Sequence, residues 1–486
     1  MKIFKIPAFI VNLLSVYSAN AINGILGIVA VPLVIAALGN EGYGIYSIYI
    51  ITASYVALID FGVTKHFIRL MSSVLDKDLQ AEYLQTAFGW YIALSIILVC
   101  ALPGLIYIVI EQLFPVPEHF RSSVNWIVIL SVAEYILAIP ITLTQAYTVS
   151  NHGFKRYSNF LTACGVFKYG LMFLAAWLYR DPVVVVLFLV LRRVFELAFM
   201  HLFLLKPPKS AWKPRINISE LKNILAKSSL MSFAQLLQIT IVSLGAVFVN
   251  RHFGVAVLGN YRAAFDLAGK IWFFSNGLGL IVFPKFSQML SIKETRESLN
   301  KKMRLWLEKS WTGYLLVSLL AVMCTPWLLP LINLGDTQIV TYFKLLIFGL
   351  CLNAHTNVSY EYLLADNRYG AVALLSFAVL IILCLSYFSI LGIAGPYAIG
   401  WAWIASQAVY AFAADALVIR SESGPWYRQC KPLFIKVLIF AITGVCLLAG
   451  LGLWPVRMVS LAPIVFIIGA FIFIKDFNEL KLFFRQ

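Results

Sequence analysis

Long apolar runs, each of about the length that crosses a bilayer, fill most of the chain. A helix needs about 20 apolar residues to span roughly 30 Å of hydrocarbon. On that measure the sequence predicts an all-α membrane protein with about fourteen transmembrane helices. The spans lie near 11–37, 44–61, 85–110, 123–149, 157–179, 182–205, 226–249, 262–283, 309–332, 338–364, 370–391, 397–419, 433–453 and 457–474.

The composition favours lipid over water as the solvent. Hydrophobic residues make up 61% of the chain and charged residues only 12%, whereas a soluble protein is about a quarter charged. So few charges cannot cover the surface of soluble domains of this total length. The formal net charge of +16 would indicate nucleic acid in a soluble protein, but in a membrane protein it indicates basic cytoplasmic loops. We therefore expect no nucleic-acid partner.

The positions of the basic residues give the topology. Of the 38 Lys and Arg residues, 28 fall on the side of the N-terminus, five on the opposite side and five within spans. Because basic loops stay in the cytoplasm, we expect both termini to be cytoplasmic. Two long inner segments, 206–225 and 284–308, mix basic residues with Leu, Trp, Ile and Met. They are interpreted either as interfacial helices on anionic lipid headgroups or as solvated connectors.

Two short segments recur along the chain. Leu38-Gly39-Asn40 is matched by Leu258-Gly259-Asn260 at an offset of 220, and the segment 151–157 resembles 366–369 at about 212. The sequence thus predicts two six-helix lobes facing each other across a cleft, a common plan for transporters. The expected domains are an N-lobe (1–205, spans 1–6), a cytoplasmic linker (206–225), a C-lobe (226–420, spans 7–12), and spans 13–14 with the tail (421–486).

Motifs for catalysis are not found in the sequence. GxxxxGK[ST], HExxH and GxSxG do not occur, and the seven cysteines form no CxxC pair. Asp76-Lys77-Asp78 is the single Asp-x-Asp motif, and we interpret it as part of a solvated loop. A membrane glycosyltransferase or polymerase would need a sizeable outer loop, which the predicted topology does not provide. We therefore expect no enzyme, no metal and no cofactor, with H⁺ or Na⁺ coupling left open.

Ionisable residues inside the predicted spans are the main functional clue, because each is costly in lipid unless paired or hydrated. Each cluster is either an internal salt bridge, a side chain that reaches the interface, or part of a polar path. Arg and Lys at membrane depth favour an anionic passenger such as a phosphate. The clusters are Arg192/Arg193/Glu196, Lys168 with Glu134 as a conceivable partner, Arg262/Asp266/Lys270, Asp60 with Lys65/His66/Arg69, Lys344/Asn353/His355/Asn357, and Asp415.

Several motifs together carry a resemblance to a known family. They are Pro32, the run 38–46, Asp60-Phe61-Gly62-Val63 with Arg69, the run from Gly254 to Ala264, Phe283-Pro284-Lys285, and Tyr362-Leu363-Leu364-Ala365. In order and spacing they resemble the bacterial polysaccharide flippases, the O-antigen and capsule repeat-unit exporters of the MOP superfamily. The resemblance covers nearly the whole chain.

The resemblance implies a V-shaped, MATE-like bundle in the bacterial inner membrane. It would move undecaprenyl-diphosphate-linked oligosaccharide from the cytoplasmic to the periplasmic leaflet by alternating access, with a polysaccharide polymerase and a chain-length regulator as conceivable partners. Lipid II flippases are related, but their first span carries an arginine that the segment 20–27 lacks. A lipid II or teichuronic-type precursor flippase and a drug/cation antiporter remain alternatives.

The residues of the cleft are assigned as hypotheses. Basic residues would hold the diphosphate, amides would bind sugar hydroxyls, and carboxylates would couple transport to an ion. The diphosphate residues are Arg69, Arg192, Arg193 and Lys270; the sugar residues are Asn20, Asn23 and Asn353; the ion-coupling residues are Asp60 and Asp266.

Overall fold

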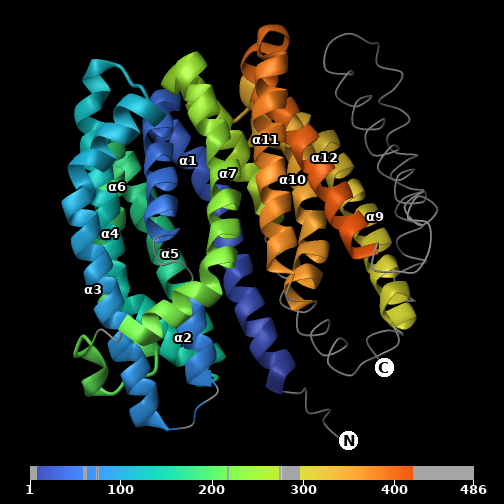
Figure 1. The fold of residues 1–486 in the computed structure, drawn as a ribbon. Helices are drawn as coiled ribbons and strands as arrows, with labels where there is room; N and C mark the ends of the chain where they lie inside the picture. Colours follow the sequence, from blue (N-terminus) through green and yellow to red (C-terminus); the bar gives the residue numbers. More distant parts are fainter. Residues whose placement is uncertain are drawn as a thin grey trace, which may run out of the picture. The chain divides into compact units, whose positions relative to one another are not determined.

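The structure, a computed structural model, describes residues 8–58, 63–72, 74, 76–215, 218–272, 275, 296–366 and 368–419. Within these ranges the chain is helical and contains no strand (Figure 1). The predicted spans at 433–453 and 457–474, and Asp60, lie outside the described residues.

Helices occupy most of the predicted spans, and the span predicted at 262–283 is described only over 262–272 and at 275. The first half contains α1 (Ala8–Leu58), α2 (Val63–Ser72), α3 (Lys77–Tyr107), η1 (Ile108–Leu113), α4 (Glu118–Ser150), α5 (Phe154–Tyr179), α6 (Pro182–Phe203) and η2 (Lys209–Trp212). The second contains α7 (Ile218–Ala268), η3 (Gly269–Ile271), α9 (Arg296–Leu331), α10 (Thr337–Ala365), α11 (Tyr369–Ala394), η4 (Gly395–Tyr397) and α12 (Ala398–Ile419).

Glycine divides the two longest helices. In α1, Gly39 has φ 70° and ψ 175°, and in α7, Gly254 has φ 84° and ψ 175°. These backbone angles are accessible almost only to glycine, so each helix consists of two arms that meet at that residue. The two arms of α1 correspond to the first two predicted spans.

Bilayer-length apolar helices make up most of the described chain. Eight segments within it are long and apolar enough to cross a membrane, by length and composition. Helix α6 is not among them, because Arg192, Arg193 and Glu196 interrupt its apolar run. Large side chains such as Ile393 (90% exposed) project outward, which fits a surface covered by lipid.

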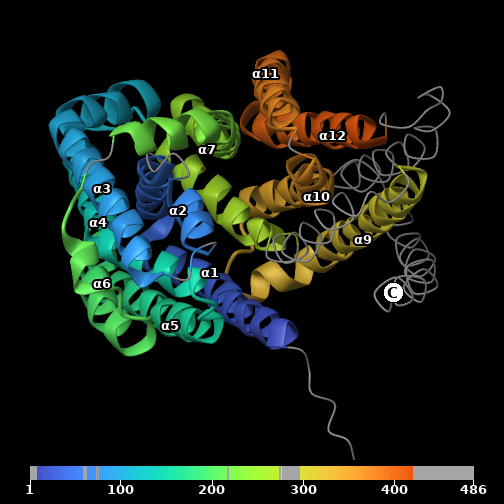
Figure 2. The same cartoon turned by 60° about the horizontal axis from the view of Figure 1, so that its bottom comes forward.

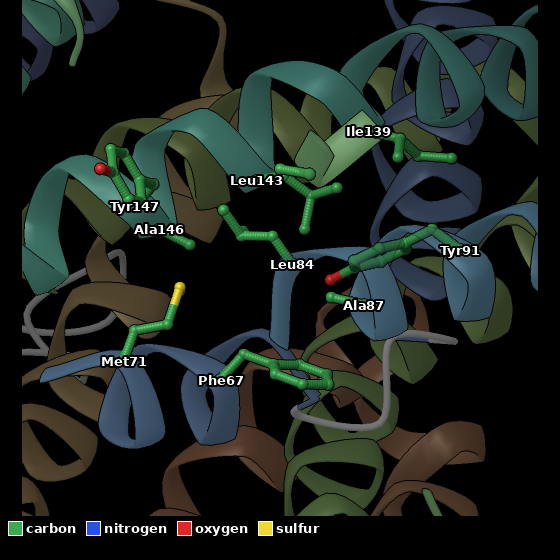
Figure 3. Close-up of a cluster of buried hydrophobic side chains, with 10 residues drawn as sticks. Phe67, Met71, Leu84, Ala87, Tyr91, Ile139, Leu143, Ala146 and Tyr147 are labelled. Atoms are coloured by element: carbon green, nitrogen blue, oxygen red, sulfur yellow. The ribbon is translucent and has the colours of Figure 1, made fainter. Parts of the chain in front are cut away.

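Backbone contacts divide the chain into two units, Met1–Ala263 and Ala264–Gln486. In the first unit, α5 packs against α1 and α6, and α4 packs against α1, α3 and α6 (Figure 1). An apolar cluster joins α2, α3 and α4, where Phe67, Leu84 and Leu143 meet (Figure 3). In the second unit, α12 packs against both α10 and α11, and α9 packs against α10 (Figure 2).

The helix pattern repeats along the chain. Helices α5 and α11 both have 26 residues and begin at 154 and 369, an offset of 215. Helices α6 and α12 both have 22 residues and begin at 182 and 398. The two kinks, at 39 and 254, are also 215 apart. The helices therefore repeat at an offset of 215–216 residues, and the offset of 220 inferred from matching Leu-Gly-Asn triplets was too long by four to five residues.

The linker is less helical than an interfacial helix would be. Residues 206–208 precede the short 3₁₀ helix η2, and α7 begins only at Ile218. The segment is attached to α3: Arg215 N donates to the Gln85 carbonyl at 3.1 Å, and Gln85 donates to the Ser210 carbonyl at 3.0 Å. Phe88 and Trp212 pack edge to face. Of the two interpretations of 206–225, the interfacial helix does not describe residues 206–215, because this part of the segment pairs with α3 instead.

Candidate functional site

Two arginines and two glutamates form a closed ring of ion pairs inside the first unit. Arg192 and Arg193 lie on α6, Glu196 lies one turn further along the same helix, and Glu134 comes from α4. Each arginine contacts both glutamates. The ring forms because three charges on one helix and one on its neighbour would each be costly in a low-dielectric bundle unless paired.

The distances show which atoms hold the ring together. Glu134 Oε1 lies 2.9 Å from Arg192 Nη2 and 2.9 Å from Arg193 Nη2. Glu196 lies 2.7 Å from Arg193 Nη1 and 3.4 Å from Arg192 Nε. Tyr49 on α1 donates its hydroxyl to the other oxygen of Glu134, Oε2, at 2.5 Å. Glu134 therefore joins α1, α4 and α6.

The ring borders a cavity of about 400 Å³, which is within the size range of ligand pockets. Arg193 and Glu134 contribute its charged groups. Residues of four helices line it, most of them with hydroxyl, aromatic or small apolar side chains. They are Tyr49, Ala53, Ser54 and Ala57 of α1, Tyr91 of α3, Ser131, Glu134, Tyr135, Ala138, Ile139 and Thr142 of α4, and Arg193 of α6. This lining combines one guanidinium and one carboxylate with hydroxyl groups and aromatic rings.

The cavity rests on the apolar cluster of α2, α3 and α4. Tyr91 and Ile139 belong to the cluster (Figure 3) and also line the cavity. Tyr91 is 2% exposed, and its hydroxyl is hydrogen-bonded to Thr64 of α2. Packing thus fixes the rim residues that a ligand would touch.

The two arginines differ in their access to the cavity. The Arg192 side chain is only 7% exposed and does not line it, whereas the Arg193 side chain is 25% exposed and does. Two guanidinium groups and two carboxylates give the ring no net charge. Of the two arginines, Arg193 is the one that a molecule in the cavity could reach, and both hold the two glutamates.

A second polar network lies in the second unit. Asp415 of α12, which is fully buried, accepts hydrogen bonds from Trp311 Nε1 at 2.8 Å and from Ser359 at 2.5 Å. His355 Nε2 lies 2.9 Å from the same carboxylate, and its Nδ1 lies 2.9 Å from Ser310 Oγ. The network connects α9, α10 and α12.

Amides form a separate link in the second unit. Trp272 donates to Asn353 Oδ1 at 2.8 Å, and Asn353 donates to Gln407 at 2.9 Å. With an offset of 215, Gln407 occupies the repeat position of Arg192. Where the first half of the repeat has a charge, the second half has an uncharged amide.

The structure brings together two of the nine residues predicted from sequence for the substrate path, Arg192 and Arg193. Asn23 donates to the Leu161 carbonyl at 3.3 Å and packs against Gly165 of α5, and Asn20 is exposed. Lys270 and Asp266 are half-buried in the second unit. Arg69 lies on α2. The roles assigned to these residues stay predictions.

Glu134, the conceivable partner of Lys168, pairs with the two arginines, and Lys168 Nζ lies 5.2 Å from the centre of the Tyr169 ring. Sequence reasoning missed Tyr49. The spacing of Tyr43, Tyr46 and Tyr49 at three-residue intervals on an apolar helix is a signal that would have placed these tyrosines on one face.

Metal ligands do not gather in the part of the chain that the structure describes, where no group of three or more His, Cys, Asp or Glu side chains could hold an ion. Asp76, from the Asp-x-Asp motif, caps α3 by accepting a hydrogen bond from the Asp78 backbone N–H at 2.8 Å. That carboxylate therefore has a structural role.

A known family matches more than half of the chain. The family described as "Polysaccharide biosynthesis protein" matches residues 34–307. No curated protein sequence matches.

Solved structures share the fold at low sequence identity. The lipid II flippase MurJ in an inward closed conformation aligns with a TM-score of 0.65 at 12% identity, over 96% of this chain and 99% of that one. An inward-facing multidrug-resistance MATE family transporter of the MOP superfamily aligns with a TM-score of 0.62 at 13% identity, over 82% and 96%. The MATE multidrug transporter DinF-BH gives 0.61 at 14%, over 86% and 96%. At such identities the likeness shows the fold alone.

Proposed function

Because the chain belongs to the family of polysaccharide biosynthesis proteins and has the fold of MOP-superfamily transporters, we propose that it flips a lipid-linked oligosaccharide across a bacterial inner membrane. The substrate proposed is an undecaprenyl-diphosphate-linked repeat unit, moved from the cytoplasmic to the periplasmic leaflet. The chain acts as a transporter, with both termini in the cytoplasm.

The observation that carries this proposal is the cavity beside Arg193, inside a bundle of bilayer-length helices. A sugar chain that entered hydrocarbon without partners would lose hydrogen bonds at a cost of several kcal/mol each. The hydroxyls of Ser54, Ser131 and Thr142 line the cavity and offer replacement partners. The guanidinium of Arg193 offers a charged partner for a phosphate.

The size of the cavity limits what it holds. A volume of about 400 Å³ is near the lower end of ligand pockets, which span roughly 300–1,000 Å³. It suits a diphosphate with the first sugar better than a whole repeat unit. We propose that Arg193 contacts the diphosphate and that Arg192 positions Glu134 and Glu196.

Translocation in proteoliposomes tests the proposal. Purified protein is reconstituted with a fluorescent undecaprenyl-diphosphate oligosaccharide, and an impermeant glycosidase reports how much substrate changes leaflet. We expect protein-dependent translocation that falls at least tenfold in Arg193→Gln, with Val409→Ala, an exposed position on α12, as the matched control. Lipid II and a cationic dye are assayed in parallel. Transport of either in place of the oligosaccharide would assign the protein to the corresponding alternative class.

A further inference from the structure

The ion-pair ring has a property that bears on how an anion enters the cavity. We propose that Glu134 is a proton-binding site linked to anion binding: when a phosphate-type headgroup engages Arg193, Glu134 takes up a proton. The inference rests on the proposed function, since it takes the anion to be the diphosphate of the substrate.

The charge balance of the ring requires a compensating change. Two arginines and two glutamates already neutralise one another, with all four side chains between 3% and 25% exposed. A diphosphate brought to Arg193 would add its whole negative charge to a neutral and largely dry site. Uncompensated charge in such a site is strongly unfavourable. A proton on one glutamate removes one negative charge and leaves a guanidinium available to the phosphate.

Glu134 is the glutamate that the geometry selects. It lines the cavity, so a proton can reach it through the cavity, whereas Glu196 does not line it. Arg193 uses both Nε, at 3.1 Å, and Nη2, at 2.9 Å, to hold Glu134 Oε1. These are the two N–H groups of a guanidinium edge that suits a phosphate in bidentate fashion. Phosphate and Glu134 thus compete for the same edge of Arg193.

Tyr49 provides a partner for the added proton. Its hydroxyl donates to Glu134 Oε2 at 2.5 Å while the carboxylate is ionised. A hydroxyl both donates and accepts, so neutral Glu134 donates its new O–H to the Tyr49 oxygen across the same contact. The Tyr49 hydroxyl proton then turns toward the cavity, which Tyr49 also lines. Protonated Glu134 therefore keeps a hydrogen-bond partner.

Other described titratable groups surround this site. They are Tyr46 on α1, Tyr91 on α3, Tyr135 on α4, Cys164 on α5 beside Glu196, and the ring members of α6. The tyrosines and the cysteine are neutral near pH 7 at their ordinary pKa values, and the arginines remain charged. Glu134 and Glu196 are thus the two groups of this set that can take up a proton.

Calorimetric binding of farnesyl diphosphate, a soluble isoprenoid diphosphate, to the purified full chain tests the linkage. Titrations in buffers of different ionisation enthalpy, over about two pH units around neutrality, count the protons taken up. We expect wild-type protein to take up about one proton more than Glu134→Gln. Its Kd should rise about tenfold per pH unit relative to that variant, because binding and protonation are reciprocally linked. Dividing the wild-type Kd by the Kd of Glu134→Gln at each pH removes the pH dependence that comes from titration of the ligand itself.

Two further variants keep the test decisive. Val409→Ala changes an exposed side chain on α12 that does not line the cavity, so it should retain the wild-type proton count. Tyr49→Phe removes the acceptor for the new proton, so it should bind more weakly and take up fewer protons, and it provides a readout if Glu134→Gln does not fold. Equal proton counts in wild type and Glu134→Gln, with binding intact, would overturn the linkage and leave the proposed function standing. Wild-type protein that binds no farnesyl diphosphate at any pH overturns the linkage and the cavity as the diphosphate site, while the translocation assay still decides the function.

Discussion

Gly44 on α1 packs so closely against α7 that a Cβ at position 44 would lie 2.3 Å from the carbonyl oxygen of Val255. The same contact occurs a second time with the halves of the repeat exchanged: a Cβ at Gly259 would lie 1.9 Å from the Asn40 carbonyl oxygen. Both pairs are related by the offset of 215 residues (44 to 259, and 40 to 255). Gly44 meets Val255, which directly follows the kink at Gly254, and Gly259 meets Asn40, which directly follows the kink at Gly39. The repeated helices therefore meet through a self-complementary contact.

This contact predicts that neither glycine tolerates a side chain. Gly44→Ala and Gly259→Ala should each destabilise the protein by about 1–3 kcal/mol, the usual cost of overpacking, because backbone atoms cannot move aside as a side chain can. Gly170→Ala on α5 is the matched control, since no atom lies within 4 Å of a Cβ there. Thermal unfolding in detergent checks this. An unchanged melting temperature in both variants would contradict the contact.

The attachment of the linker predicts a change in protease sensitivity. A Cβ at Gly89 of α3 would lie 2.5 Å from the Arg215 carbonyl oxygen, so Gly89→Ala should displace the segment 206–215 from α3. That segment contains two trypsin sites, after Lys209 and after Arg215, whereas Lys206 and Lys213 precede proline and are not cut.

We therefore expect trypsin to cut Gly89→Ala several-fold faster within this linker than it cuts the wild-type protein. Gly104→Ala, on the same helix with nothing near its Cβ, should be cut at the wild-type rate. Mass spectrometry of the fragments identifies the cleavage site. Equal rates for all three proteins would show that the linker is not held by α3.

The sequence predicted the helices well and the partners of their charges poorly. Twenty apolar residues in lipid have few alternatives to a helix, because every backbone group must be hydrogen-bonded internally, so hydropathy alone places α3, α4 and α5. Which charges meet depends on the packing of helices far apart in sequence. Glu134 and Arg193 are 59 residues apart, and no periodicity within α4 or α6 specifies that pair.

The kinks illustrate a similar limit. Leu-Gly-Asn occurs at both 38–40 and 258–260, but only the first of these glycines is at a kink, and the second kink is at Gly254. The triplets look equivalent, yet positive φ and close packing are separate reasons to need a glycine. Gly259 is required by the carbonyl of Asn40, which sequence comparison alone does not show.

The His355–Asp415 network predicts a large loss of stability when its acceptor is removed. Asp415→Ala leaves three buried donor groups, on Trp311, His355 and Ser359, without a partner, at about 1–3 kcal/mol for each unsatisfied group. Asp415→Asn keeps one acceptor oxygen and should lose less. Val409→Ala, exposed on the same helix, should change the free energy of unfolding by less than about 0.5 kcal/mol. Chemical unfolding followed by Trp fluorescence measures these differences, and equal stabilities of the Ala and Asn variants would contradict the assigned hydrogen bonds.

The ring of ion pairs predicts that balanced substitutions are tolerated better than single ones. Arg192→Gln leaves Glu134 and Glu196 sharing one arginine in a site where their side chains are 8% and 3% exposed, so it should cost about 3–5 kcal/mol, the usual cost of breaking a buried pair. Arg192→Gln with Glu134→Gln restores a neutral ring, and we expect it to be more stable than Arg192→Gln alone. A double-mutant cycle on the free energy of unfolding measures this coupling.

Neutralising both arginines together leaves two buried carboxylates unpaired, so we expect that variant to be the least stable, and a loss of transport in it would not separate folding from binding. Arg193→Gln and its combination with Glu134→Gln make that separation: both remove the cation that faces the cavity, but only the first unbalances the ring. Transport lost in both while stability falls only in the first would identify Arg193 as a substrate contact, whereas transport that recovers with stability in the double variant would show that Arg193 serves the fold alone.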